Sequence, residues 1–215
     1  MPREGMQRPG GQANAVVIGA SAGGITAIQV ILEKLDGSPV CPFIFCLHLH
    51  PSQGESLYLD HFFSKYAGFP VSEADSMVKP KSGQGYIAPP NYHLVVERDQ
   101  TFSLTVEERI NYSRPCIDLL FETAADTWRK SLIGILLTGA NSDGAAGLLR
   151  IRQYGGTAIA QDPDEAESAE MPKSAIEMDA ASNVMRLEEI SAYLNRTVMR
   201  DTKRKEGTPV DATLG

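Results

Sequence analysis

The sequence has few of the features that would place it in a membrane or outside the cell. No apolar run in its 215 residues approaches the roughly 18 residues that a membrane span requires. The N-terminus lacks the charged and then apolar pattern of a signal peptide. Only three cysteines occur, and they match neither a metal motif nor a disulfide framework. We therefore expect a cytoplasmic protein that is not inserted into a membrane and whose thiols are buried.

Positive charge is also scarce. The chain has 27 acidic and 20 basic side chains, which gives a formal net charge of −7. This balance disfavours electrostatic binding of the whole domain to nucleic acid or to anionic lipid, although a local basic patch stays possible in principle. We expect no nucleic-acid partner. The hydrophobic content of 42% and the charged content of 22% are ordinary for a globular protein.

Apolar periodicity is missing at both ends of the chain. Residues 1–14 and 201–215 are charged or rich in Gly and Pro, and they are predicted to be disordered tails. The remaining segment, residues 15–200, has the length of a single α/β domain.

Within this segment, short apolar runs alternate with glycine-rich turns and helical patterns. The middle of the chain differs, because short strand-like pieces at 85–88, 93–97 and 101–106 indicate a hairpin-rich insertion or an antiparallel edge. The sequence thus predicts an α/β fold with a doubly wound, mostly parallel sheet flanked by helices and a small antiparallel hairpin region. The other predicted strands are residues 15–18, 41–49, 132–138, 157–160 and 182–187. The predicted helices are a segment that follows Gly24 and includes Leu35, and residues 54–66, 115–130 and 145–154.

Three of the predicted strands end beside a reactive side chain, namely Ser21, His48 and Asp143. Sites in open α/β sheets form at the carboxyl ends of the strands. The segment Gly19–Gly23 matches G-x-S-x-G, a pattern that exposes a serine on a tight turn before a helix. The same turn could be purely structural, or it could cradle a phosphate or dinucleotide, although Ser21 stands where the dinucleotide motif needs a glycine.

The histidine and the carboxylate also have alternative interpretations. His48 could be structural, or it could bind a metal together with His50. A metal site would need further ligands, so we predict no metal site. Asp143 could cap the helix that starts at Ala145, or it could accept a hydrogen bond from a histidine Nδ1. The order Ser, His, Asp along the chain differs from that of α/β-hydrolases.

Several motifs together resemble the catalytic domain of CheB-type protein-glutamate methylesterases, over about residues 16–194. Ala22 departs from the family pattern, which often has threonine there, and Ala140-Asn141 replaces Met-Gly. The matching motifs are Ile18–Gly24, Tyr86–Pro89, Arg114–Phe121, Leu136–Ala145, Ala160–Asp162 and Met171–Ala175.

This resemblance implies roles for individual residues. Ser21 would be the nucleophile, His48 the general base and acid, and Asp143 the orienting carboxylate. Counting back from Pro51 instead of forward from the strand would favour His50 as the base. The backbone N–H groups of Ala22 and Ala140 would form the oxyanion hole.

The resemblance also implies a reaction and its partners. The enzyme would hydrolyse glutamate γ-methyl esters on the cytoplasmic helices of methylated chemoreceptors without a cofactor, and it could also deamidate receptor glutamine. Chemotaxis members usually carry a receiver domain ahead of the catalytic domain. Because only 14 residues precede the first predicted strand, we expect none here. The enzyme would then be constitutively open, be controlled by a separate regulatory protein, or have been cut from a larger chain. A catalytically inactive binding module and a nucleotide-binding domain stay as alternatives.

Overall fold

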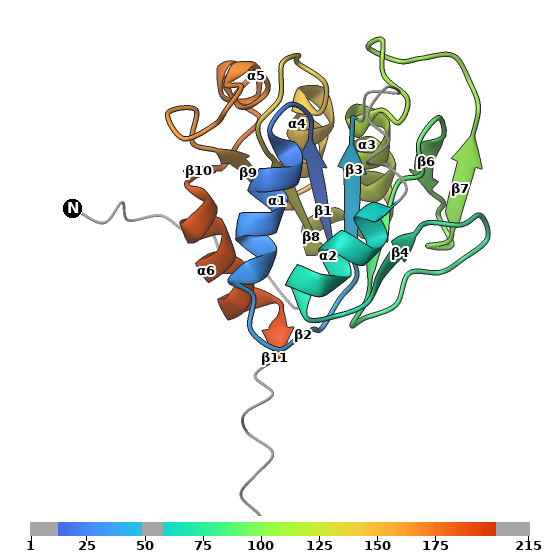
Figure 1. Ribbon diagram of the computed structural model, residues 1–215. Helices are drawn as coiled ribbons and strands as arrows, with labels where there is room; N and C mark the ends of the chain where they lie inside the picture. Colours follow the sequence, from blue (N-terminus) through green and yellow to red (C-terminus); the bar gives the residue numbers. More distant parts are fainter. Residues whose placement is uncertain (1–12, 49–57, 201–215) are drawn as a thin grey trace, which may run out of the picture.

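The structure is a computed structural model that describes residues 13–48 and 58–200 (Figure 1). The predicted tails lie mostly outside the described residues, as does His50. Seven parallel strands form the central sheet in the order β10-β9-β8-β1-β3-β5-β4. These strands are β1 (Ala15–Ala20), β3 (Phe43–Leu47), β4 (Val71–Glu73), β5 (Gly85–Ile87), β8 (Leu132–Leu136), β9 (Thr157–Gln161) and β10 (Asn183–Met185).

Four strands at the centre of the sheet, β1, β3, β8 and β9, are buried along their whole length. This explains why their sequences are continuous apolar runs. Successive side chains point to opposite faces of the sheet. In β1, Val16 and Ile18 therefore pack into one hydrophobic cluster, and Ala15 and Val17 pack into another. The sheet thus separates two cores, one on each face.

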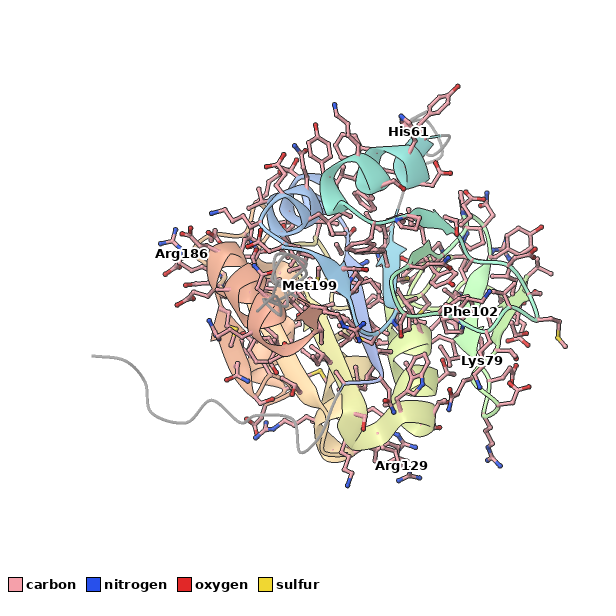
Figure 2. All side chains as sticks on the ribbon, turned by 90° about the horizontal axis from the view of Figure 1, so that it is seen from below. His61, Lys79, Phe102, Arg129, Arg186 and Met199 are labelled. Atoms are coloured by element: carbon pink, nitrogen blue, oxygen red, sulfur yellow. The ribbon has the colours of Figure 1, made fainter. Side chains whose placement is uncertain are left out.

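Helices cover both faces of the sheet (Figure 1). Seen from below, helices α1 (Gly24–Glu33) and α2 (Leu59–Ala67) lie on one side of the strands and α3 (Ile117–Trp128) lies on the other (Figure 2). One face carries α1, α2 and α6 (Leu187–Thr197), and the other carries α3, α4 (Ala145–Gln153) and α5 (Glu170–Glu177). The predicted doubly wound α/β fold is confirmed.

The middle of the chain is only partly as expected. β6 (His93–Val96) and β7 (Phe102–Thr105) form the predicted antiparallel hairpin. The first predicted piece, however, is β5, which pairs in parallel with β3 and belongs to the main sheet. The assignment of residues 85–88 to an antiparallel region was therefore wrong, because three apolar residues carry no information about strand direction.

The sequence interpretation also missed several elements. It did not identify β4, α5 and α6, nor the small antiparallel sheet of β2 (Ser38–Pro39) and β11 (Met199–Arg200), nor the 3-10 turn Arg129–Ser131 that follows α3. Among the helices that the structure describes, none is long and apolar enough to cross a membrane.

Candidate active site

The order of the strands brings the three predicted residues to one edge of the sheet. β1 lies between β3 and β8, so the chain leaves β1 toward β3 on one side and later returns to β8 on the other. Such a reversal opens a crevice at the carboxyl ends of the strands. Ser21 follows β1, His48 follows β3, and the loop that holds Asp143 follows β8.

Ser21 lies on a tight turn between β1 and α1. Its N–H donates to the carbonyl of Thr138 (2.9 Å), and its own carbonyl accepts from the N–H of Gly24, the first residue of α1 (2.8 Å). Gly139 passes so close that a Cβ atom there would lie 2.9 Å from the Cβ of Ser21. The turn is therefore fixed by its contacts with the loop after β8.

His48 and Asp143 form a hydrogen-bonded pair, with Nε2 and Oδ2 2.8 Å apart. The His48 side chain is 12% exposed and that of Asp143 is fully buried. The sequence interpretation expected contact through Nδ1, and this was wrong. The His48 N–H donates to the carbonyl of Ala20 (3.1 Å), which fixes the backbone after β3, and the ring presents Nε2 to the carboxylate. Nδ1 makes no hydrogen bond with any described residue and is the ring nitrogen left for another group.

The carboxylate of Asp143 lies at the N-terminus of α3. Oδ2 accepts the N–H of Ile117 (2.8 Å), and Oδ1 accepts the N–H of Asp118 (3.1 Å). Cys116 Sγ and Asn111 Nδ2 also donate to Oδ1, each over 3.2 Å. The free N–H groups at a helix start are suited to a negative charge. Asp143 thus caps α3, not the helix that starts at Ala145 as one interpretation of the sequence suggested.

These contacts determine the charge of the pair. Burial acts to raise the pKa of Asp143, but the hydrogen bond from His48, the N–H of Ile117 and the positive charge of protonated His48 outweigh it. The pKa of Asp143 is therefore held well below its usual range, and the side chain is a carboxylate at neutral pH. A fixed carboxylate of this kind orients an imidazole and stabilises its protonated form.

Asp118 is a second carboxyl group beside this pair. Burial is the main cause that raises its pKa to about 6; the nearby charge of Asp143 acts in the same direction, and the hydrogen bond from the N–H of Gly147 acts in the opposite one. Asn111 Nδ2 bridges the two groups, because it donates to Asp118 Oδ2 (3.0 Å) as well as to Asp143. Asn111 therefore donates one amide group to both of two carboxyl groups whose charges repel each other.

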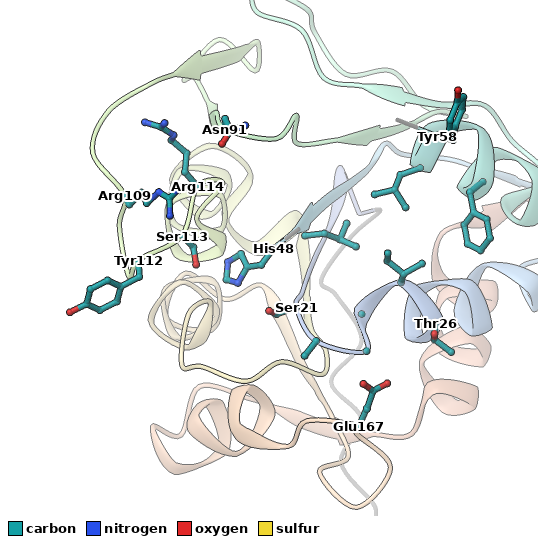
Figure 3. Close-up of a pocket in the computed structure, with 17 residues that line it drawn as sticks. Ser21, Thr26, His48, Tyr58, Asn91, Arg109, Tyr112, Ser113, Arg114 and Glu167 are labelled. Carbon is teal, nitrogen blue, oxygen red and sulfur yellow. The ribbon is translucent and has the colours of Figure 1, made fainter. Parts of the chain in front are cut away.

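Ser21 and His48 both line a cleft of about 1200 Å³ (Figure 3). Ser21 Oγ makes no hydrogen bond with His48 or with any other residue that the structure describes. Beyond Asp143 lies a second hollow of about 760 Å³. The cleft is lined by Ser21–Thr26, Leu47, His48, Tyr58, Leu59, Phe62, Asn91, Arg109, Tyr112–Arg114 and Glu167.

The two residues predicted for an oxyanion hole lie on different loops. Ala22 lines the cleft, and Ala140 lines the second hollow directly after Gly139, which contacts Ser21. Neither backbone N–H is bonded within residues 13–48 and 58–200, so both are free to donate. Both residues are exposed.

The structure bears on two of the alternative interpretations. A Cβ atom on Gly23 would lie 2.7 Å from Glu167 Oε2, so a carboxylate already occupies the space beside the start of α1, and a phosphate bound there would be repelled. The partner in the H-x-H pair, His50, lies outside the described residues. Within the described part of the chain, no three His, Cys, Asp or Glu side chains are grouped so that they could hold a metal ion.

Sequence reasoning did not identify three residues that build this site. Cys116 lies within the motif Arg114–Phe121, so its position beside a predicted carboxylate could have been suspected. Asn111 and Glu167 had no such signal, because they lie 32 and 24 residues from Asp143 in the chain and only the fold brings them to the site.

Comparison with known proteins agrees with this architecture. The family model described as CheB methylesterase matches residues 16–194. A relative from Leptospira interrogans, named putative protein-glutamate methylesterase/protein-glutamine glutaminase, is 47% identical over 85% of this chain and 93% of its own length. A Pseudomonas putida relative with the same activities in its name is 36% identical over 89% of this chain, but this covers only 55% of its own length.

A solved structure is also similar. The Thermotoga maritima CheB methylesterase catalytic domain superposes with a TM-score of 0.80, at 31% sequence identity, over 86% of this chain and 99% of that one. Together with the family match over residues 16–194, this shows that the chain belongs to the CheB methylesterase family.

Proposed function

We propose that this protein is a serine hydrolase that removes methyl groups from glutamate γ-methyl esters of chemoreceptors. The observation that carries the proposal is the buried His48–Asp143 pair, 2.8 Å apart, in the wall of the same cleft as Ser21. A relative that is 47% identical to this chain carries this activity in its name. The catalytic unit is proposed to span residues 15–200 and to act in the cytoplasm, where the methylated helices of such receptors lie.

The chemistry follows from the orientation of the imidazole. Nε2 is engaged by Asp143, so Nδ1 of His48 is the base that takes the proton from Ser21 Oγ. The oxygen attacks the ester carbonyl, and the N–H groups of Ala22 and Ala140 stabilise the oxyanion. Protonated His48 then gives its proton to the departing methoxide, methanol leaves, and an acyl-enzyme remains.

Deacylation repeats these steps with water. His48 takes a proton from water, the hydroxide attacks the acyl-enzyme, and glutamate and free Ser21 are released. The acyl-enzyme would be the same if ammonia left from a glutamine side chain, so deamidation is proposed as a second activity of the same residues. This matches the second activity in the names of the relatives.

The proposal is tested by comparing Ser21 with a serine outside the site. Ser21→Ala should abolish labelling by a fluorophosphonate and lower methanol release from a methylated receptor fragment by about 10⁴-fold or more. Ser72→Ala is the control, because Ser72 is exposed on β4 and lines neither hollow, so this variant should retain both activities within a fewfold. Full demethylation by the Ser21→Ala protein would refute the proposal.

The identity of the base is tested in parallel. His48→Ala should abolish turnover, and His50→Ala should retain it, because the carboxylate of Asp143 bonds His48. If the unmodified protein binds the receptor fragment but neither labels nor releases methanol, the chain is a non-catalytic binding module.

A further inference from the structure

The loop between β7 and α3 forms one rim of the cleft, and we call residues 106–114 the rim loop. Hydrogen bonds from a buried histidine outside the loop and from the arginine at its own end hold its backbone. His93 is fully buried, and its Nε2 donates to the carbonyl of Glu108 (3.0 Å). The Arg114 guanidinium donates to the carbonyls of Val106 and Glu107, each over 2.9 Å. The rim loop is therefore held in one conformation before any partner binds.

Two of its residues adopt a left-handed backbone conformation that side chains disfavour. Asn111 has φ of 51° and Tyr112 has φ of 63°. Asn111 offsets this cost through its bonds to Asp118 and Asp143. Tyr112 makes no hydrogen bond with the described residues and is 95% exposed. The strained turn thus holds a large aromatic ring in solvent.

Tyr112 lies where the two hollows meet, because it lines both the cleft and the second hollow. Its ring points outward at the rim in Figure 3, on the same side of the cleft as Arg109. Arg109 is exposed and forms no ion pair with the described residues, while Glu107 and Glu108 beside it do not line the cleft. Tyr and Arg are the side chains most enriched where binding energy concentrates at interfaces.

The opposite wall carries the opposite charge. Glu167 lies across Ser21 from the rim loop (Figure 3), beside the start of α1. In a chain of net charge −7, the cleft therefore has one cationic side, formed by Arg109 and Arg114 of the rim loop. A carboxylate on a bound segment would be attracted to the rim loop and repelled by Glu167.

We propose that the rim loop recognises an acidic helix of the substrate protein, with Arg109 pairing with a carboxylate near the methyl ester and Tyr112 packing on the helix. This rests on the proposed function. The charge difference between the walls would set the direction in which the helix lies across Ser21. Arg109 and Tyr112 would contribute to substrate binding and not to the bond-breaking steps, whereas Asn111 of the same loop bonds Asp143.

The test uses two versions of the methylated receptor fragment. One is unchanged, and in the other the acidic residues within one helical turn of the ester are replaced with glutamine. The unmodified protein should have about tenfold higher kcat/KM on the acidic version, and Arg109→Glu should remove this preference by raising KM. Arg98→Glu is the matched control, because Arg98 is exposed in the β6–β7 turn and lines neither hollow.

Tyr112 is tested in the same way. Tyr112→Ala should raise KM about tenfold on both fragments, whereas Met77→Ala, which alters an 81% exposed residue outside both hollows, should not. Fluorophosphonate labelling of Ser21 should stay within twofold in both rim-loop variants. Equal kcat/KM on the two fragments, or a preference that survives Arg109→Glu, would overturn the proposal.

The readouts separate this proposal from the proposed function. If the unmodified protein neither labels at Ser21 nor hydrolyses either fragment, the hydrolase assignment fails, and the rim-loop proposal fails with it. If labelling and turnover are normal but the rim-loop variants behave like the controls, only the recognition proposal fails. If Arg109→Glu or Tyr112→Ala also lost labelling at Ser21, the recognition proposal would be overturned. These side chains would then support His48 and Asp143 instead of binding substrate.

Discussion

Asp143 is the residue on which most contacts of the site converge. Its two carboxylate oxygens receive the N–H groups of Ile117 and Asp118, the side chains of Cys116 and Asn111, and the ring of His48. A buried carboxylate is stable only when such donors replace the water it has lost. The same network that lowers its pKa also positions His48, so stability and the proposed chemistry depend on one side chain.

This network predicts how stability depends on pH. Asp143→Asn should lower the free energy of unfolding by about 3 kcal/mol at pH 7. Both oxygens of the carboxylate accept hydrogen bonds, whereas the NH₂ group of asparagine would face N–H donors and leave them unpaired. Asp143 has a depressed pKa when folded, so its contribution is complete above its unfolded value near 3.8 and is lost as pH falls below it.

The difference between the two proteins should therefore narrow below about pH 4, as measured by urea unfolding at several pH values. Asp36→Asn is the control, because Asp36 is exposed and its carboxylate accepts no hydrogen bond from the described residues, so its loss should change stability little. A difference that stayed constant from pH 7 down to pH 2.5 would contradict this account.

At the scale of elements, the site depends on how closely α3 and α4 pack. Both helices cover the same face of the sheet, and Gly147 of α4 lies directly against α3. A Cβ atom on Gly147 would lie 2.5 Å from the Cβ of Phe121 and 2.8 Å from the carbonyl oxygen of Asp118. The Gly147 N–H also donates to Asp118 Oδ1 (2.7 Å). This contact fixes the start of α3 under Asp143.

Gly147→Ala should therefore destabilise the protein although alanine favours helices. Replacing glycine within a helix gains about 1 kcal/mol of propensity, but overpacking costs about 1–3 kcal/mol, and here the neighbours include backbone. We expect a net loss in urea unfolding, together with slower fluorophosphonate labelling, because the start of α3 must move.

The neighbouring exposed position supplies the control. Ala146→Gly should cost about 1 kcal/mol through propensity alone and leave labelling unchanged. A Gly147→Ala protein more stable than the unmodified one would show that the helices are not in close contact.

At the scale of the whole molecule, one sheet holds two hydrophobic cores together. Phe63 of α2 packs in the core on one face, and Leu148 of α4 packs in the core on the other. Both cores contain side chains of the same strands, so neither face can open without exposing the sheet. Residues 13–48 and 58–200 should therefore unfold as one cooperative unit.

Calorimetry of two variants tests this. Phe63→Ala and Leu148→Ala each remove a fully buried side chain and should cost about 2–5 kcal/mol. Each should lower the Tm of the same single transition by an amount on the order of 10 °C. Two separate transitions, each moved by only one of the variants, would show that the faces unfold independently.

Much of this architecture could be predicted from the sequence. The runs that became β1, β3, β8 and β9 are apolar throughout because both faces of each strand are covered, and that pattern is visible without coordinates. The turn at Gly19–Gly24 and the position of Asp143 could also be predicted, since each directly follows such a run. Short elements could not be predicted. β4 and β5 have three residues each, which is too few for a sequence pattern to show strand pairing or direction.

By itself, the sequence determined the α/β class, the family resemblance and the three residues at the strand ends, because these depend on local composition and spacing. Only the tertiary structure decided which atoms meet. It brought His48 Nε2 instead of Nδ1 to Asp143, placed Asp143 at the start of α3, and set Arg109 and Glu167 on opposite sides of Ser21. Such contacts join residues that are far apart in the chain. Strand order and helix packing bring these residues together, and no local sequence pattern encodes either of them.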